Sequence, residues 1–454
     1  MKRIFFATFA VLVFLISHAT PQYKVSVRPI NGKWEEIKVY PWKVAHVVQA
    51  KQTNEESSVA AFEMGQPMEI VVEVLDRTIR SARIRPMSYD IPFTQQANKI
   101  CFTLDRPRYL SIEVNGDIYH NLQLFADSVM PKVKKRKNVI YFAPGYHEIK
   151  DSLKVESGQT VYLAAGAYVK GYISVWNAQN VKILGTGIVN PERQQEGIMV
   201  RYSKNVEING PLTTQIPVGG SENVRVSNAK VISWYGWGDG MNVFASNHVA
   251  YNHVFCRTSD DCSTIYCTRK GYHGGCSDIR IHDAIYWADV AHPIMIGLHG
   301  DIDKNEEIKD VVYDDIDILQ QNEKQIDYQG CIGINNGDNI LVRDILFSNI
   351  RVESLSCGML FNMRVCYNKK YCHAPGRGIE NITFRNITYT GREPNMSIIT
   401  GYNEERKVKN VRFEKLVING LHIADDMKMK PTWYKTSDFA NMFVGEHVEN
   451  VEFK

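Results

Sequence analysis

The segments Asn180–Ile183 (NVKI), Asn205–Ile208 (NVEI) and Asn223–Val226 (NVRV) share one pattern, a polar residue followed by alternating apolar and polar residues. The early copies begin 18 to 30 residues apart, which is the length of one solenoid coil. We expect the polar residue to lie in a turn and stack on its neighbours, while the apolar positions fill the bore. The repeat predicts an all-β chain built on a right-handed parallel β-helix. Later copies are His248–Tyr251, Asp278–Ile281, Asn381–Phe384, Asn410–Phe413 and Asn450–Phe453.

The chain before this repeat has a different texture. Met68–Val74 and Tyr109–Val114 alternate apolar and polar residues, and turn residues such as Asn115–Asp117 separate such segments. This pattern is typical of an antiparallel β-sandwich. Pro131 and the basic run Lys132–Lys137 mark a boundary. We therefore expect an N-terminal β-sandwich over residues 20–130 and a β-helix over residues 131–454, with the sandwich on the first coils, capping the open end of the solenoid.

The first residues have the form of an export signal. Met1–Arg3 is a basic start, Ile4–Ile16 is almost wholly apolar, and Ser17–Ala19 supplies small residues for cleavage. The apolar run is short for a membrane span, so cleavage is favoured over anchoring. Residues 1–19 are therefore predicted to be a signal peptide. The mature chain is expected in the periplasm or outside the cell, without an integral membrane anchor.

Composition narrows the partners. The formal net charge is only +3, and no basic stripe runs along the chain, which argues against nucleic acid. The nine cysteines do not form paired CxxC motifs, so neither a metal nor another cofactor is expected. The clustered cysteines are expected either to be buried as small apolar residues or to form one or two disulfides; they are Cys256, Cys262, Cys267 and Cys276. We expect a monomer.

Three aspartates carry the candidate chemistry. Asp239 precedes Asp260 by 21 residues and Asp261 by 22, so one coil would return the chain to the same sheet about 4.8 Å higher. Strict strand alternation would send Asp260 and Asp261 to opposite faces, so their meeting requires a bend or bulge at the strand end. Gathered carboxylates raise at least one pKa, which supplies the protonated acid and ionised base of glycoside hydrolysis. Turn-forming or calcium-holding aspartates are the structural alternative.

The stretch Trp237–Gly300 resembles the catalytic coils of glycoside hydrolase family 28 (polygalacturonases) and family 49 (dextranases and isopullulanase). Both families carry Asp-Gly on one coil and Asp-Asp on the next, as in Asp239-Gly240 and Asp260-Asp261. The resemblance implies that Asp260 is the general acid, that Asp239 and Asp261 activate water, and that the anomeric configuration is inverted. It also implies a polysaccharide or oligosaccharide substrate, either an α-linked glucan or a pectic galacturonan.

Other segments help to distinguish a resemblance to family 28 from a resemblance to family 49. Ala291–Gly297 resembles the Gly-His-Gly segment of polygalacturonases and also its dextranase counterpart, and His292 is expected to orient a carboxylate or bind sugar. Cys331–Asn336 stands where polygalacturonases carry Arg-Ile-Lys, and it contains no cation, which puts a uronate substrate in doubt. Leu122–Ala126 resembles the sandwich that precedes the β-helix in the dextranase group.

The remaining substrate-binding candidates are Trp237, Tyr266, Asn335 and Arg364. Aromatic faces suit sugar rings, although aromatic residues in a solenoid are equally often core residues. Two other functions stay open. A polysaccharide lyase or epimerase would use an Arg or Lys base, and a noncatalytic β-helix would bind carbohydrate without cleaving it.

Overall fold

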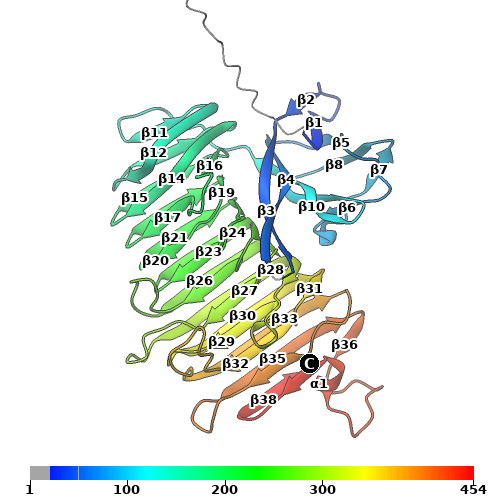
Figure 1. Cartoon of the computed structure of the whole chain (residues 1–454), viewed down its shortest axis with the longest axis vertical. Helices are drawn as coiled ribbons and strands as arrows, with labels where there is room; N and C mark the ends of the chain where they lie inside the picture. The colour runs from blue at the N-terminus through cyan, green and yellow to red at the C-terminus, as the bar shows by residue number, and fades with distance from the viewer. Residues whose placement is uncertain (1–20, 50) are drawn as a thin grey trace, which may run out of the picture.

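The computed structural model describes residues 21–49 and 51–454, and its architecture is almost entirely β (Figure 1). The predicted signal peptide, residues 1–19, lies outside the described residues. Among the described residues, no helix has the length and apolar character needed to cross a membrane. The helices are short: η1 (Met87–Tyr89), η2 (Ile326–Tyr328) and α1 (Thr436–Phe439).

A solenoid begins at Val139 and forms one 28-stranded sheet that is parallel except for the β35–β36 pair. Most strands pair with the second or third strand further along the chain, as expected when each coil lies on the previous one (Figure 1). The strands before the site are β11 (Val139–Phe142), β12 (Gly145–Val155), β13 (Thr160–Leu163), β14 (Ala167–Trp176), β15 (Gln179–Leu184), β16 (Ile188–Asn190), β17 (Ile198–Arg201), β18 (Lys204–Asn209), β19 (Leu212–Thr213), β20 (Val218–Gly219), β21 (Glu222–Ser227) and β22 (Lys230–Ile232). Those from the site onward are β23 (Met241–Phe244), β24 (Asn247–Thr258), β25 (Ser263–Tyr266), β26 (Cys276–Ala288), β27 (Ile294–Gly297), β28 (Glu307–Asn322), β29 (Ile332–Asn336), β30 (Leu341–Val352), β31 (Leu355–Cys357), β32 (Phe361–Val365), β33 (Gly378–Tyr389), β34 (Ser397–Thr400), β35 (Val408–Ile418), β36 (Leu421–Ile423), β37 (Met442–Val444) and β38 (Val448–Phe453).

The polar residue that opens each repeat forms a turn ladder, as the sequence predicted. Asn180, Asn205 and Asn223 have φ values of 57°, 57° and 56°, in the left-handed region that Asn tolerates better than most residues. The Asn205 amide donates to the Asn180 side-chain oxygen over 3.1 Å, and the Asn223 amide donates to Asn205 over 2.6 Å. Each turn therefore fixes the register of the next coil.

The alternating apolar positions fill the bore. Val181, Val206, Val224, Val249 and Ile279 pair in sequence along five neighbouring coils, and all are fully or almost fully buried. Aligned β-branched side chains pack well on a pleated surface, so the repeat builds its own core as it grows. The clustered cysteines Cys256, Cys262, Cys267 and Cys276 are buried in this same core and unpaired in the structure, which agrees with the small-apolar reading.

The chain before residue 130 forms two five-stranded sheets with a common apolar core. The first has the order β2-β1-β5-β8-β7 and the second β3-β4-β10-β9-β6. Their strands are β1 (Tyr23–Pro29), β2 (Glu35–Ile37), β3 (Val39–Val48), β4 (Lys51–Met64), β5 (Met68–Val74), β6 (Ala82–Arg85), β7 (Phe93–Gln96), β8 (Lys99–Leu104), β9 (Arg108–Val114) and β10 (Asp117–Ser128).

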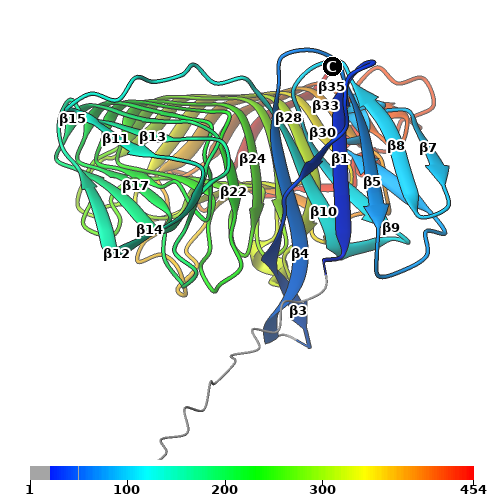
Figure 2. The same cartoon turned by 90° about the horizontal axis from the view of Figure 1, so that it is seen from above.

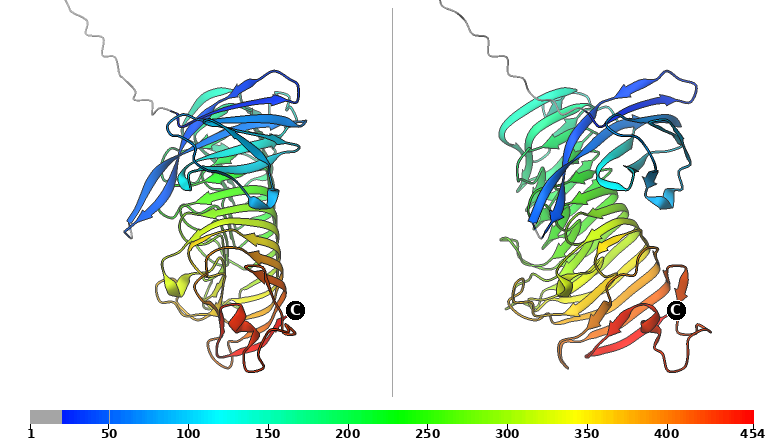
Figure 3. Two further views of the ribbon diagram at one scale, coloured as in Figure 1. Left: turned by 90° about the vertical axis from the view of Figure 1, so that its right-hand side faces the viewer. Right: turned by 45° about the vertical axis from the view of Figure 1, so that its right-hand side comes forward.

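This N-terminal unit lies along the side of the solenoid, so the expectation that it caps the open end is wrong. Figures 1 and 2 show β3 and β4 beside the middle coils, with the first coils uncovered at their end, and Figure 3 shows the same lateral contact. The contact joins Trp42, Tyr109 and Phe125 to solenoid residues as far apart as Ile188 and Leu319. An apolar stripe that crosses several coils fixes a side-on position, because that position buries the most apolar surface.

Buried ion pairs complete this contact. The Lys230 ammonium lies 2.6 Å from the Asp127 carboxylate, and both side chains are fully buried. Arg85 similarly bridges Glu113 of the N-terminal unit, at 2.9 Å, and Glu353 of the solenoid, at 2.6 Å. Each charge is compensated inside the contact, which is the condition for burying it at tolerable cost.

Candidate active site

Asp239 and Asp261 occupy equivalent positions on neighbouring coils. β23 pairs with β25 so that Met241 lies opposite Ser263, and each aspartate stands two residues before its strand. Backbone hydrogen bonds continue the register below the strands, since the Gly240 amide donates to the Asp261 carbonyl over 2.8 Å. The 21- and 22-residue spacing therefore places the aspartates of the two coils next to each other, as predicted.

The chain bends where Asp260 and Asp261 lie. β24 ends at Thr258 and β25 begins at Ser263, with irregular backbone between them. The Thr258 hydroxyl donates to the Asp260 carbonyl over 2.7 Å and holds this bend. Asp239, Asp260 and Asp261 consequently line one cavity of about 390 Å³. The bend that the strand alternation required is present.

Asp261 is held by several donors. The Nδ1 atom of His292 lies 2.6 Å from Asp261 Oδ1, the His292 backbone amide donates to the same oxygen over 3.2 Å, and the Tyr266 hydroxyl donates to Oδ2 over 3.2 Å. The other ring nitrogen of His292 lies 2.5 Å from the Tyr328 carbonyl. Both nitrogens thus face acceptors, so both donate and the ring is an imidazolium.

The charge state of His292 agrees with this geometry. Burial by itself disfavours the imidazolium, but the charge of Asp261 and its hydrogen bond outweigh burial and raise the pKa of His292. The side chain has no exposed surface. Of its two predicted roles, His292 therefore has the geometry for orienting a carboxylate and not for touching sugar.

Asp239 and Asp260 have the character of proton carriers. Burial, reinforced by the charge of Asp261, raises the pKa of Asp239 to about 7, although the Asn242 amide donates to it over 2.6 Å and partly opposes the shift. Burial, followed by the charges of Asp239 and Asp261, raises the pKa of Asp260 well above its ordinary value. Like charges gathered in a poorly solvated pocket cannot all ionise at neutral pH. The site therefore holds a proton where an acid needs one.

The other predicted contact residues divide into two groups. Trp237 stands at the cavity with 81% of its surface exposed, and Tyr266 lines the wall, so both meet the cavity as predicted. Asn335 is fully buried on β29, and its amide contacts the Met295 sulfur at 3.7 Å. Neither Asn335 nor Arg364 on β32 belongs to the cavity lining. Asn335 and Arg364 lie on strands of the solenoid sheet, as the sequence indicated, but neither side chain reaches the cavity.

Several lining residues were missed from the sequence, because they come from loops between coils. Arg269 and Lys270 follow β25 directly, and a search of the strand ends for charged turns would have found them. Glu323 adds a fourth carboxylate, and its charge, after burial and the two neighbouring aspartates, contributes to the raised pKa of Asp260. No local signal pointed to the rest, which comprise Val290, Ala291, Leu298, His299, Gln325, Tyr328 and Tyr371.

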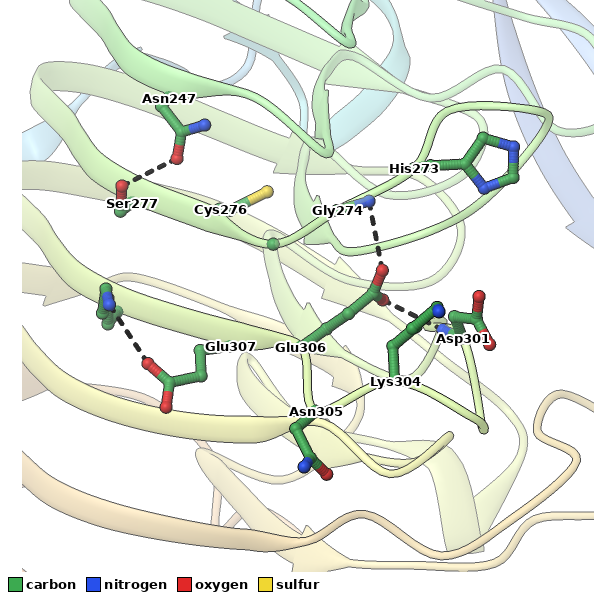
Figure 4. Close-up of a pocket in the computed structure, with 12 residues that line it drawn as sticks. Asn247, His273, Gly274, Cys276, Ser277, Asp301, Lys304, Asn305, Glu306 and Glu307 are labelled. Atoms are coloured by element: carbon green, nitrogen blue, oxygen red, sulfur yellow. Dashed lines mark hydrogen bonds and ion pairs between the residues drawn. The ribbon is translucent and has the colours of Figure 1, made fainter.

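A second hollow, larger at about 750 Å³, is lined by other residues than this cavity (Figure 4). Its central carboxylate, Glu306, is occupied with loop contacts: it accepts from the backbone amides of Gly274 (3.1 Å) and Asp301 (2.9 Å). Glu307 at its rim pairs with Lys309 and Arg343. These carboxylates are committed to structure. Across residues 21–49 and 51–454, no group of three His, Cys, Asp or Glu side chains is placed to hold a metal ion.

Comparisons with known proteins agree with this architecture. No family model matches the chain, and no curated protein matches it in sequence. Among solved structures, Dex49A from Penicillium minioluteum matches with a TM-score of 0.61 and 15% identity, over 94% of this chain and 94% of that chain. The family 28 exopolygalacturonase of Yersinia enterocolitica matches with a TM-score of 0.49 and 11% identity, over 84% of this chain and 96% of that chain. The polygalacturonase of Erwinia carotovora ssp. carotovora gives 0.42 and 12%, over 73% and 91%.

The predicted resemblance to β-helix glycoside hydrolases is thereby confirmed at the level of the fold, through the match to Dex49A. The match to Dex49A spans nearly all of both chains, and at its low identity it establishes the fold. The fold is that of a parallel β-helix preceded by an N-terminal β-unit.

Proposed function

We propose that this protein is a glycoside hydrolase that cleaves a polysaccharide by an inverting acid/base mechanism. One observation carries the proposal: three aspartates from two adjacent coils line a single cavity, two with a raised pKa and the third held by an imidazolium. The fold shared with Dex49A supports it.

Each aspartate has a role that its surroundings favour. Asp260, whose pKa burial and the neighbouring aspartates raise well above its ordinary value, donates its proton to the leaving glycosidic oxygen. Asp261 is oriented by its contact with His292, and it shares with Asp239 the task of orienting and deprotonating the attacking water. Trp237 offers its exposed face to a sugar ring at the cavity mouth. His292 is a positioning residue, because it acts through Asp261.

A lyase or epimerase is the second candidate, because such enzymes use an Arg or Lys side chain as base and Arg269 and Lys270 line the same cavity. Hydrolysis is favoured because β-elimination has no use for three gathered carboxylates. The two reactions leave different products. Hydrolysis releases new reducing ends only, whereas elimination also creates an unsaturated sugar that absorbs ultraviolet light.

The test is a screen of α-glucans, pectic polymers and charged glycans with the wild-type chain and Asp260→Asn. New reducing ends without ultraviolet absorbance, lost in Asp260→Asn, are expected. Products that absorb would identify a lyase. Carbohydrate binding that survives in the absence of any cleavage would identify a binding module.

Inversion is tested by proton NMR of the earliest products, before mutarotation mixes the anomers. An inverting site leaves room for water, with carboxyl groups about 6.5–9.5 Å apart, and it uses three carboxylates as one acid plus two water-orienting groups. The first product should carry the opposite configuration from the cleaved bond. Retention, or a trapped glycosyl-aspartate, rules the mechanism out.

The setting of this activity is part of the proposal. The basic start, apolar run and small residues of segment 1–19 support export to the periplasm or the medium. The two N-terminal sheets and their common core support a β-sandwich domain, and the chain is proposed to work as a monomer with right-handed coils. Either a dextran- or pullulan-type α-glucan or a pectic galacturonan fits the resemblance.

A further inference from the structure

A tight turn at the edge of the cavity presents two adjacent cations. Arg269 and Tyr272 exchange backbone hydrogen bonds of 3.1 and 2.9 Å, and the residues between them, Lys270 and Gly271, have φ values of 52° and 84°. Two successive left-handed residues define a type I′ hairpin turn, whose usual sequence is Asn-Gly. A lysine in this conformation is uncommon and costs free energy. Holding Lys270 in this turn therefore costs conformational free energy.

The turn is fixed on both sides. The Tyr202 hydroxyl donates to the Gly271 carbonyl over 2.8 Å, and the Tyr272 ring stacks on Phe244 with centroids 5.9 Å apart and planes 4° from parallel. At the base of the loop, Glu306 accepts from the Gly274 amide and from Thr268, as Figure 4 shows for Gly274. Arg269 and Lys270 thus start from a backbone that several independent contacts hold in place, which lowers the entropy cost of binding with them.

Neither cation forms an ion pair among the described residues, although the charges of both partly oppose the raised pKa of Asp239. In the described part of the chain, no carboxylate lies within ion-pair distance of Arg269 or Lys270. Their closest partners there are ring faces: the Arg269 guanidinium lies 5.0 Å from the Tyr266 centroid, and the Lys270 ammonium 5.7 Å from that of Phe244. Cations on the outer coils behave differently, since Lys182 pairs with Glu207 at 2.7 Å and Lys204 with Glu222 at 2.9 Å.

The neighbouring histidine does not change this balance. Burial, and after it the charge of Arg269, lowers the pKa of His299 to about 3, so this ring is neutral at any working pH. The cavity therefore has an acidic side, formed by the three aspartates and Glu323, and a cationic side formed by Arg269 and Lys270 alone. Two fixed, unpaired cations facing a sugar-sized cavity match an anionic group on the ligand.

We propose that Arg269 and Lys270 bind an anionic substituent, a carboxylate or a sulfate ester, on the sugar chain held in the cavity. This inference rests on the proposed hydrolase function and narrows its substrate to an anionic polysaccharide. The proposal also explains how an anionic polysaccharide is bound although Gly333 and Asn335 stand where the polygalacturonase cations would be. The cations come from the turn after β25 and not from β29.

The experiment measures binding apart from cleavage. Asp260→Asn serves as the parent, and its affinity is measured for two matched pairs of polymers: polygalacturonate with its fully methyl-esterified form, and a sulfated galactan with its desulfated form. The charged member of one pair should bind at least about tenfold more tightly than its neutral partner, because each charge-assisted contact is worth more than a neutral one. The pair that shows the preference distinguishes a carboxylate from a sulfate. The preference should also weaken with added salt.

The deciding variant adds Arg269→Gln and Lys270→Gln to this parent and should abolish the preference. Lys182→Gln with Lys204→Gln, which removes the same charge from the outer coils, should leave it intact. Equal affinity for charged and neutral polymers in both pairs, failure to bind either charged polymer, or a preference that survives without Arg269 and Lys270 would overturn the inference. A charge preference without cleavage by the wild-type chain would instead overturn the hydrolase function alone, and cleavage of neutral polymers only would do the reverse.

Discussion

Two carboxylates on neighbouring coils, buried Asp289 and partly buried Asp260, have opposite surroundings. Asp289, at the contact with the N-terminal unit, receives two hydrogen bonds from Arg257, of 2.8 and 3.0 Å, and one from the Trp287 indole of 2.9 Å. Asp260 lies three residues after Arg257 in the chain. Among the described residues, its side chain accepts one hydrogen bond, of 3.1 Å, from the backbone amide of Asp261. In the contact region Asp289 touches a cation directly, while Asp239 and Asp260 in the cavity form no ion pair among the described residues.

This difference separates structure from chemistry. A carboxylate paired with a cation holds two units together and so stabilises a single arrangement, although burial raises the pKa of Asp289 even beside Arg257. An unpaired carboxylate beside others raises its pKa and keeps a proton that it can transfer. If this division holds, substitutions in the cavity should affect turnover and substitutions in the contact region should affect stability.

The largest effect is expected for Asp260→Asn. The amide preserves shape but cannot donate an acidic proton, so kcat should fall about 10³- to 10⁴-fold, while the melting temperature should not fall, because the amide has no charge to bury. Turnover and thermal unfolding measure the two quantities. Asp303→Asn, on an exposed loop, is the matched control and should change neither. Near-normal turnover in Asp260→Asn would remove it from the role of acid.

In the contact region the same kind of change should affect stability. Lys230→Met leaves Asp127 buried without its partner at 2.6 Å, so the free energy of unfolding should fall by about 3–5 kcal/mol. Urea denaturation provides the measurement. Adding Asp127→Leu to the variant should recover much of the loss, because no unpaired charge is left. A loss below about 1 kcal/mol in Lys230→Met would mean that this pair does not hold the units together.

An intermediate effect is expected for His292→Gln. Glutamine keeps a hydrogen-bond donor near Asp261 but not the positive charge, so kcat should fall about 10- to 100-fold with little change in KM. The pH–rate profile should also change, because the charge that His292 places beside Asp261 is lost. Unchanged kcat and an unmoved profile would reduce His292 to a packing residue.

The smallest effect is a pH-dependent gain of stability in Asp239→Asn. Folding raises the pKa of Asp239 from its unfolded value near 4 to about 7, so its favourable contribution is complete below pH 4 and is lost as the pH rises through 7. The amide has no charge to bury. The variant should therefore match the wild type near pH 4 and exceed it above pH 7 by on the order of 1–3 kcal/mol. Parallel denaturation curves across pH would contradict the raised pKa.

The turn after β25 marks the limit of reading this chain from its sequence. The repeated turn residues, such as Asn180 and Asn205, mark the start of each coil. The 21-residue spacing by itself predicts that Asp239 lies at the level of Asp260. Arg269 and Lys270 can be found in the sequence as a charged turn after a strand, but nothing local indicates that they line the cavity. Their meaning depends on Tyr202, Phe244 and Glu306, which come from other coils.

The sequence by itself determined the parallel solenoid, the composition of its bore and the coils that carry the three aspartates. Those features follow from strand alternation and a constant coil length, both of which act over a few tens of residues. Only the tertiary structure decided the bend that turns Asp260 and Asp261 into one cavity, the imidazolium at His292, and the side-on place of the N-terminal unit. Proton affinities and docking depend on which distant groups share a poorly solvated space, and only the folded chain sets those distances.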